Sequence, residues 1–403
     1  MRGLSSDEAA AVERCAGEPM PAQVEAWAAV NSGSRNLDGL GRMAGLLADE
    51  FAGLPGPLTL RDPSPVEAVA PDGSLRALDH GRNLHLAVRP EAEVQLLFTG
   101  HMDTVFAPEH PFQSVFEREA GVIGGPGVAD MKGGLAVLLA ALKAVEASPL
   151  AARLGYEIVI NSDEEVGSPG SAALIAEAAR GKKAALTYEP STLPDGTLAG
   201  ARPGSGNFSI VIRGRSAHAG RNPKDGRNAI IAAALLVLRL ANADRPGLSV
   251  NPARIDGGGP NNVVPDLAIV RVNFRPATPD MERFAQLHIE QSVEAIATRL
   301  QVSMEIHGGF GRPPKPLDQR AGKLLALVRD CGADLGQAIG WRDTGGVCDG
   351  NNIAACGVPV VDTMGVRGGA IHSSDEYLIV ESLVERAQLS ALAILRLAQG
   401  EGL

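Results

Sequence analysis

The first half of the chain alternates between short apolar runs and longer stretches rich in Ala and Leu. The apolar runs at 93–100, 155–165 and 183–190 have the length and composition of buried strands. The stretches at 130–148 and 168–181 have those of helices. Strands that alternate with helices in this way are typical of parallel βαβ units. We therefore expect an α/β fold in which helices flank a sheet.

A different pattern begins near residue 204. Its expected elements are, in chain order, a strand at 207–214, a helix at 225–244, paired strands at 248–258 and 266–276, a helix at 278–300 and a strand at 301–308. In the second helix Thr278 is the expected cap and Pro279 the first helical residue. After the Pro-rich connector RPPKPLDQ a βα pattern resumes. This order predicts a small α+β domain at 204–316, inserted into a catalytic domain made of 1–203 and 317–403.

The composition limits the class of protein. A chain of 403 residues exceeds the usual size of a single core, which agrees with two domains. The formal net charge of -10 argues against nucleic-acid and membrane partners, which need basic surface. Four cysteines without a C-x-x-C pair favour free thiols. No signal peptide is visible, so we expect a cytoplasmic protein, although a chain with its leader removed would look the same.

Acidic and imidazole side chains follow several of the predicted strands, where open α/β sheets place their sites. In chain order they are His101 and Asp103, Asp130, Asp163 with Glu164 and Glu165, Glu189, and His372. Taken singly, each has an ordinary explanation as a helix cap, a turn residue or solvated surface. Together, two imidazoles and several carboxylates match the ligands of Zn²⁺ or another divalent ion.

The motifs GHMDTVF, GVADMKGG and SDEEVGSPGS resemble those of a zinc-dependent exopeptidase and amidohydrolase family. This family includes bacterial glutamate carboxypeptidase, acetylornithine deacetylase, succinyl-diaminopimelate desuccinylase and aminoacylase. The similarity extends from WAAVNSGSRNLDGL to HSSDEYL, and GRSAHAG and GGGPNNVVPD fit the family's inserted dimerisation domain. The segment from TGGVCDG to SSDEY is most similar to the glutamate carboxypeptidase branch. The resemblance implies a mixed, mainly parallel sheet flanked by helices, with an inserted βαββαβ domain.

The resemblance also implies a metal centre of two zinc ions, for which Co²⁺ or Mn²⁺ are possible substitutes. The ligands would be His101, Asp130 and Glu189 for one ion and Asp130, Glu165 and His372 for the other, with Asp130 bridging. Asp103 would orient His101, as carboxylates often do for ligating imidazoles. The peptide after Asp130 would be cis, and glycines at 133 and 134 would let the backbone pass close to the metals.

Glu164, next to a ligand, is the expected general base. The two ions would lower the pKa of a bridging water, and Glu164 would take its proton during attack on the amide. His218 in GRSAHAG would bind the oxyanion and is usually supplied by the partner subunit in this family. We therefore expect a homodimer in which His218 acts in trans.

Several residues match family positions that contact a substrate carboxylate. Asn262 and Arg275 are the main ones, and Arg312 falls at a similar place in the glutamate carboxypeptidases. Gly345 and Gly346 would offer backbone N–H groups to the same end of the substrate. Arg202, Thr344, Asp349 and Asn351 are weaker candidates for the pocket wall. A guanidinium forks onto a carboxylate through two hydrogen bonds, which suits recognition of a C-terminus.

The leading interpretation is a metallo-carboxypeptidase that releases a C-terminal, preferably acidic residue from peptides, oligo-acidic chains or N-acyl amino acids. A second is an N-acyl amino acid deacylase of the acetylornithine or succinyl-diaminopimelate type, with the same metals and a different pocket. A third is a silent binding protein, but no ligand and no general base is missing. The sequence has no G-x-G-x-x-G opening a helix after the first strand and no G-x-S-x-G, which disfavours dinucleotide enzymes and serine hydrolases.

Overall fold

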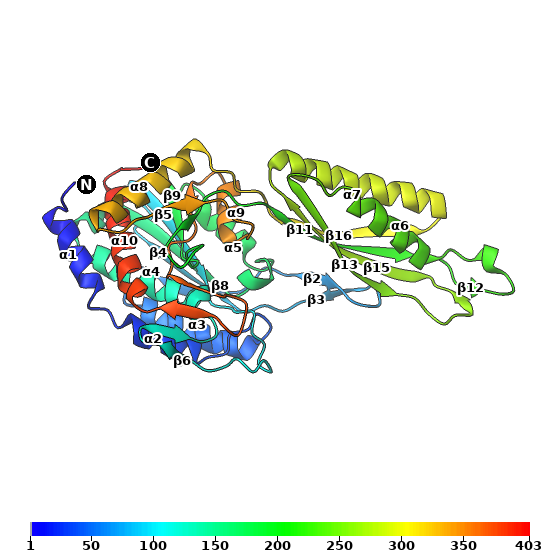
Figure 1. Cartoon of the computed structure of the whole chain (residues 1–403), viewed down its shortest axis with the longest axis horizontal. Helices are drawn as coiled ribbons and strands as arrows, with labels where there is room; N and C mark the ends of the chain where they lie inside the picture. Colours follow the sequence, from blue (N-terminus) through cyan, green and yellow to red (C-terminus); the bar gives the residue numbers. More distant parts are fainter. Residues whose placement is uncertain (1) are drawn as a thin grey trace.

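The computed structural model describes residues 2–403, which form two units side by side (Figure 1). The larger unit is built on a six-stranded sheet in the order β1-β4-β8-β5-β9-β18. Its strands are β1 (Leu58–Arg61), β4 (Asn83–Val88), β5 (Val94–His101), β8 (Leu154–Asn161), β9 (Ala184–Thr187) and β18 (Val360–Val361). The neighbours β8-β5, β5-β9 and β9-β18 are parallel, whereas β1-β4 and β4-β8 are antiparallel. The expected mixed, mainly parallel sheet is confirmed.

Helices cover both faces of this sheet. They are α1 (Ser6–Cys15), α2 (Met20–Ala28), α3 (Leu37–Phe51), α4 (Gly133–Glu146), α5 (Ala172–Ala179), α8 (Gln319–Asp334), α9 (Asp349–Ala355) and α10 (Glu381–Ala398). Leu96 and Phe98 of β5 join the main core, which contains α4 and α10. Leu97 faces the other side and packs with residues of α5 and α9. Because β5 is buried on both faces, its sequence is a continuous apolar run rather than an alternating one.

Two smaller sheets border the main one. The first has the order β19-β20-β7-β6 and contains β6 (Phe116–Glu119), β7 (Val122–Gly124), β19 (Gly368–Gly369) and β20 (Tyr377–Ile379). The turn between β19 and β20 carries His372. The second pairs β10 (Leu198–Ala199) with β17 (Trp341–Arg342).

The second unit is a four-stranded antiparallel sheet in the order β13-β15-β11-β16, with both of its helices in one core. Its elements are β11 (Ser205–Arg213), α6 (Ala229–Ala241), β13 (Leu248–Gly257), β15 (Leu267–Pro276), α7 (Pro279–Leu300) and β16 (Ser303–Arg312). The Thr278 side chain caps α7 by accepting a hydrogen bond from the Met281 N–H. The short strands β12 (Ala217–His218) and β14 (Val263–Val264) pair at the end farthest from the larger unit (Figure 1).

The strand predicted at 301–308 continues to Arg312 as β16. The physical reason is aromatic packing, because Phe310 lies against Phe208 and Phe274, with ring centroids 5.3 and 6.5 Å away. The two connections to the larger unit also run together, since Arg202 and Lys315 exchange backbone hydrogen bonds of 2.9 Å.

A hairpin of β2 (Glu67–Val69) and β3 (Leu75–Ala77) reaches from the larger unit to the second one (Figure 1). Val69 packs with Val211 and Ile269 of its sheet. Arg271 donates a hydrogen bond to the Val69 carbonyl at 2.9 Å, and Arg213 donates one to the Gly73 carbonyl at 2.7 Å. Within the described residues no helix combines the length and the apolar character needed to cross a membrane.

Candidate metal centre

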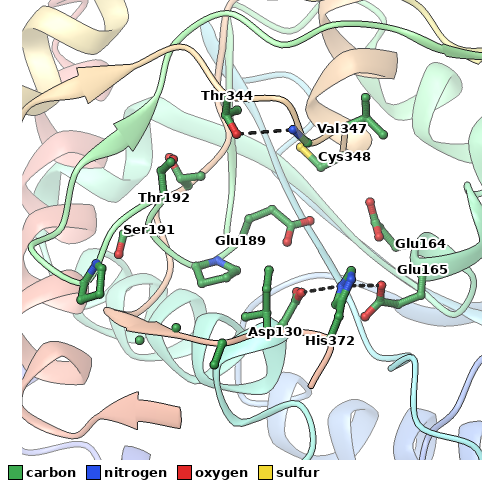
Figure 2. Close-up of a pocket in the computed structure, with 18 of the residues that line it drawn as sticks. Asp130, Glu164, Glu165, Glu189, Ser191, Thr192, Thr344, Val347, Cys348 and His372 are labelled. Atoms are coloured by element: carbon green, nitrogen blue, oxygen red, sulfur yellow. Dashed lines mark hydrogen bonds and ion pairs between the residues drawn. The ribbon is translucent and has the colours of Figure 1, made fainter. Parts of the chain in front are cut away.

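The carboxyl ends of the parallel strands bring the predicted ligands to one edge of the sheet. His101 is the last residue of β5, Glu164 and Glu165 follow β8, and Glu189 follows β9. Asp130 comes from the segment just before α4. Figure 2 shows Asp130, Glu164, Glu165, Glu189 and His372 pointing into one hollow.

Asp130 lies between the two imidazoles. Its Oδ1 is 3.2 Å from His101 Nε2, and its Oδ2 is 3.2 Å from His372 Nε2. His372 Nε2 is also 3.1 Å from a Glu165 oxygen, and His101 Nε2 is 3.7 Å from Glu189. One carboxylate that offers each oxygen to a different histidine has the geometry of a bridging ligand.

Two sets of three donor atoms lie within 4.8 Å of one another: His101, Asp130 and Glu165, and His101, Glu164 and Glu189. Each set differs from an expected ligand set by one residue, since the first has His101 in place of His372 and the second has Glu164 in place of Asp130. His372 completes the first set through its contacts with Asp130 and Glu165.

The site concentrates negative charge in a buried place. Burial and the charge of Asp130 raise the pKa of Glu165 to about 8. Burial also raises the pKa of Glu164 to about 7, although the charge of Arg312 opposes this. Hydrogen bonds to Asp130 and Glu165 raise the pKa of His372 to about 11. Carboxylates held this close together repel one another, and divalent cations would relieve that repulsion.

An unpartnered oxygen supports the same conclusion. Glu189 Oε1 is buried and has no hydrogen-bond partner among residues 2–403. A buried carboxylate oxygen without a donor is costly, unless a cation supplies the missing interaction. The oxygen and nitrogen donors also suit Zn²⁺. The residues present therefore fit a pair of divalent ions.

The backbone before α4 departs from the predicted helix. The helix was expected from Asp130, but α4 begins at Gly133 because Asp130 and Met131 have non-helical dihedral angles. The peptide bond between them is cis, as the resemblance implied. A Cβ on Gly134 would lie 1.9 Å from the Tyr188 carbonyl, so the close approach is to the backbone beside Glu189.

Asp103 lies beside His101 and also contacts the segment that follows β8. Its Oδ1 is 3.4 Å from His101 Nδ1, while its backbone carbonyl is 3.0 Å from the same nitrogen. The carboxylate also accepts the backbone N–H groups of Glu164 and Glu165, at 3.0 and 3.2 Å. Asp103 thus holds the segment that carries both acidic side chains, which the position of a lone His-x-Asp did not reveal.

Glu376 has a positioning role that the sequence analysis missed. Its buried carboxylate accepts backbone N–H groups from Gly127, Ala129 and Asp130 at 3.0–3.1 Å. It therefore fixes the loop that carries the bridging aspartate. In the sequence it stands in the hydrophilic run HSSDEY, where nothing distinguishes it from its exposed neighbour Asp375.

Arg312 contacts Glu164 rather than open solvent. Its Nη1 lies 2.6 Å from Glu164 Oε1, without hydrogen-bond alignment, and its Nη2 donates to the Glu164 carbonyl at 2.9 Å and to Ser168 at 3.0 Å. Asp349 lies 3.5 Å from the same nitrogen. Arg312 ends β16, so this contact joins the second unit to the candidate general base.

The hollow beside the metal ligands has a volume of about 440 Å³. Arg202, Thr344 and Gly346 line it. Arg202 donates to Asp362 through two nitrogens, at 2.8 and 3.0 Å, and to the Gly346 carbonyl at 3.2 Å. A second hollow of about 670 Å³ between the units is lined by Arg275 and Gly346, among others. Arg275 Nη1 lies 3.4 Å from the Gly345 carbonyl, so these candidates lie together.

Other weak candidates support the walls of these hollows. Asn351 donates to the carbonyls of Pro203 and Pro313, both at 2.8 Å, and so ties both connections between the units to α9. Asp349 accepts hydrogen bonds from Asn161 and Ser168. Both side chains are buried and act within the protein.

His218 and Asn262 are not part of this cluster. They lie on the β12–β14 pair, where His218 pairs with Val263 and the Ala219 N–H donates to the Asn262 carbonyl. This pair is at the end of the second unit that is farthest from the metal ligands (Figure 1). The structure therefore separates these two residues from the other predicted site residues of the same chain.

Comparison with protein families gives a match over most of the chain. The model of peptidase family M20/M25/M40 matches residues 97–396. The chain belongs to this family. The chain is also 30% identical to carboxypeptidase G2 of Pseudomonas sp. (strain RS-16), over 80% of this chain and 78% of that protein. It is 26% identical to a succinyl-diaminopimelate desuccinylase of Verminephrobacter eiseniae, over 72% and 75% of the two chains.

Solved structures of M20 peptidases share the fold. A tripeptidase from Staphylococcus aureus has a TM-score of 0.72 at 23% identity, covering 96% of this chain and 99% of that one. An M20 family metallo-carboxypeptidase from Sulfolobus solfataricus has a TM-score of 0.69 at 14% identity, covering 94% and 99%. The family membership makes this protein a metallopeptidase or amidohydrolase, which agrees with the metal ligands brought together at the sheet edge.

Proposed function

We propose that this M20 hydrolase is a carboxypeptidase that cleaves the amide bond to a C-terminal, preferably acidic residue. Its substrates would be peptides, oligo-acidic chains or N-acyl amino acids. The observation that carries the hydrolytic role is the Asp130 carboxylate, which faces one imidazole with each oxygen while Glu165 and Glu189 flank it. The similarity to carboxypeptidase G2 supports the carboxypeptidase assignment.

Two divalent ions, zinc in our proposal, would be held by His101, Asp130 and Glu189 and by Asp130, Glu165 and His372. When bound, they would polarise the amide carbonyl and make a deprotonated water available near neutral pH. Glu164 would accept the proton of the attacking water and deliver it to the leaving nitrogen. The N–H contacts of Asp103 and the ion pair with Arg312 hold Glu164 in place.

The preference for an acidic residue rests on positive charge around the site. Arg275 lines the hollow between the units, and its guanidinium suits a substrate carboxylate. Backbone N–H groups of Gly345 and Gly346, and Asn262 of the partner subunit's tip, would complete the recognition. Arg312 adds to this positive charge, but it pairs with Glu164. We therefore propose that it positions the general base rather than binds the substrate.

We further propose a homodimer in which His218 acts in trans. In its own chain His218 lies far from the metal ligands, and it is exposed, with Nδ1 accepting the backbone N–H groups of Gly220 and Arg221 at 3.1 and 3.2 Å. The side of the second unit formed by α6 and the edge strand β13 exposes Ile231, Leu238 and Ile255 at 52%, 65% and 46%. An unpaired edge strand beside exposed apolar side chains is a suitable dimer surface.

A substrate panel tests the proposal. The protein is stripped of metal with a chelator, reconstituted with Zn²⁺, and assayed with N-acyl-Glu, N-acyl-Asp, N-acyl-Leu and N-acetylornithine. We expect zinc to restore release of the free amino acid, and the two acidic substrates to be cleaved fastest. Faster cleavage of N-acyl-Leu would refute the acidic preference. Preference for N-acetylornithine would favour the deacylase alternative, which the desuccinylase relatives support.

A further inference from the structure

A separate groove meets the metal centre from another side. It is bounded by residues 33–38, by residues 104–109 after β5, and by Glu165 and Val166, and its volume is about 730 Å³. Glu165 also lines the hollows that contain Arg202 and Arg275. The groove therefore borders a proposed metal ligand, but none of the proposed carboxylate-binding residues lines it.

The floor of this groove is fixed before any ligand arrives. The Ser34 N–H donates to the Thr104 carbonyl at 3.1 Å, and the Thr104 N–H donates to the Ser32 carbonyl at 3.0 Å. The Asn31 side chain donates to the Phe106 carbonyl at 3.0 Å. Gly33 lies so close that a Cβ there would be 2.4 Å from the same carbonyl. These contacts make the groove a preformed surface rather than a gap between mobile loops.

The groove displays apolar side chains that the protein leaves uncovered. Leu37 and Val105 are each 41% exposed, and Val166 is 38% exposed. They are three of the 13 large apolar side chains found exposed within residues 2–403, and all three line this one groove. A group of exposed apolar side chains in a concave site next to reacting groups is the usual form of a ligand subsite.

The charges around the groove do not favour an anionic ligand. Arg35 is its cation, and its guanidinium already lies 3.4 Å from the Asp79 carbonyl and 3.1 Å from His80 Nε2. Asp38 and Glu109 line the same groove with negative charge. A ligand that carries its own carboxylate here would meet Asp38 and Glu109, besides the proposed metal ligand Glu165, for one engaged arginine.

We infer that this groove binds the acyl side of the substrate, and that it selects a bulky, uncharged, apolar acyl group or upstream side chain. The inference rests on the proposed function, in which the leaving amino acid occupies the hollows with Arg202 and Arg275. In the described part of the chain, the groove is then the one hollow beside Glu165 that is left for the acyl side of the scissile amide. An acetyl group offers one methyl to a hollow of about 730 Å³, whereas an aromatic acyl group covers Leu37 and Val105.

The test compares N-benzoyl-glutamate with N-acetyl-glutamate, using kcat/KM of the zinc-loaded enzyme. We expect wild type to prefer the benzoyl substrate. Leu37→Gln should lower the ratio of benzoyl to acetyl kcat/KM by about tenfold, because it removes apolar contact from one substrate only. Val105→Trp should fill the groove and lower this ratio further, because the indole takes the space that the benzoyl group would occupy.

Leu46→Gln is the matched control. Leu46 lies on the same helix α3, is 39% exposed, and is not among the residues that line the groove. This variant should keep the wild-type ratio. Hydrolysis with an unchanged ratio in Leu37→Gln and Val105→Trp would overturn the groove assignment alone, as would a wild-type preference for N-acetyl-glutamate. Failure of the zinc-loaded wild type to cleave any of these substrates would instead overturn the proposed function, and the groove assignment with it.

Discussion

The metal-centre edge of the larger unit and the β12–β14 tip of the second unit carry candidate residues in opposite states. At the sheet edge, His101, Asp103, Asp130, Glu164 and Glu189 are all buried, and only the side chain of His372 is 53% exposed among the proposed metal ligands. Most are held by hydrogen bonds or ion pairs from several elements. At the tip, His218 and Asn262 are exposed. The side chains of the first region are held by contacts within their own chain. Those of the second would reach a metal site only through contact with a partner subunit.

This contrast has a physical basis. Buried carboxylates need partners, so the fold must supply N–H groups, arginine or metal for each of them. His218 accepts only the backbone N–H groups of its own turn, from Gly220 and Arg221 at 3.1 and 3.2 Å, and it has no contact with the metal ligands of its own chain. Substitutions at the sheet edge should therefore change chemistry, metal affinity or stability in a single chain, whereas those at the tip should depend on the assembly.

The largest effect is expected for Glu164→Gln. Loss of the proton acceptor should reduce kcat by up to about 10⁴-fold, or about 5.5 kcal/mol, while two metal ions stay bound. The measurement is kcat for the best substrate, with metal content determined by elemental analysis. Glu305→Gln, an exposed carboxylate on β16, is the control and should behave as wild type. A Glu164→Gln enzyme that retains activity would remove the general base from the proposal.

The next effect tests the connections between the larger unit and the second unit. Asp362 is fully buried, and it holds Arg202 at 2.8 Å and Lys315 at 3.2 Å beside the two connections. Asp362→Asn should cost about 3–5 kcal/mol of unfolding free energy, because it leaves buried cations without their counter-charge. Denaturant unfolding in the presence of a chelator measures this cost. Asp343→Asn, an exposed carboxylate nearby, should change little.

The difference in stability between wild type and Asp362→Asn should also depend on pH. Burial alone would raise the pKa of Asp362, but the charges and hydrogen bonds of Arg202 and Lys315 prevail and lower it. A lowered folded-state pKa means that the stabilisation is present above the unfolded-state pKa of about 3.9 and is lost as the pH falls through the folded-state value. The difference between wild type and Asp362→Asn should therefore shrink below about pH 4. A constant difference down to pH 2.5 would contradict this origin.

The same contrast explains what the sequence could predict. The apolar run of β5 and the Ala-rich stretch of α4 specify buried elements by composition, and strands that end together place His101 and Glu189 at one edge. Glu376 and Arg312 could not be placed, because their partners are backbone N–H groups and a side chain more than a hundred residues away. The extension of β16 to Arg312 depended on the packing of Phe310 against Phe208 and Phe274, which no local pattern encodes.

The next prediction concerns the tip. His218→Ala should reduce kcat by about 10²- to 10³-fold, or about 2.7–4 kcal/mol, as loss of an oxyanion donor does. His307→Ala on β16 is the control. Mixing His218→Ala with Glu164→Gln after subunit exchange should restore about a quarter of wild-type activity, because each mixed dimer has one intact site. Two inactive variants that stay inactive as mixed dimers would exclude action in trans.

The smallest effect is expected for Glu376→Gln, and it tests whether the sheet edge is organised before metal binds. The two carboxylate oxygens of Glu376 accept the N–H groups of Gly127, Ala129 and Asp130. The amide of glutamine has only one oxygen that can accept them. The loop carrying Asp130 should then loosen, and zinc affinity should fall about 10- to 100-fold, or about 1.4–2.7 kcal/mol. Competition with a chelating dye measures this, and Asp375→Asn at the exposed neighbour is the control. Unchanged zinc affinity would mean that the bound cations, rather than Glu376, hold Asp130 in place. The metal-centre edge would then also depend on a ligand for its order, and it would differ less from the β12–β14 tip.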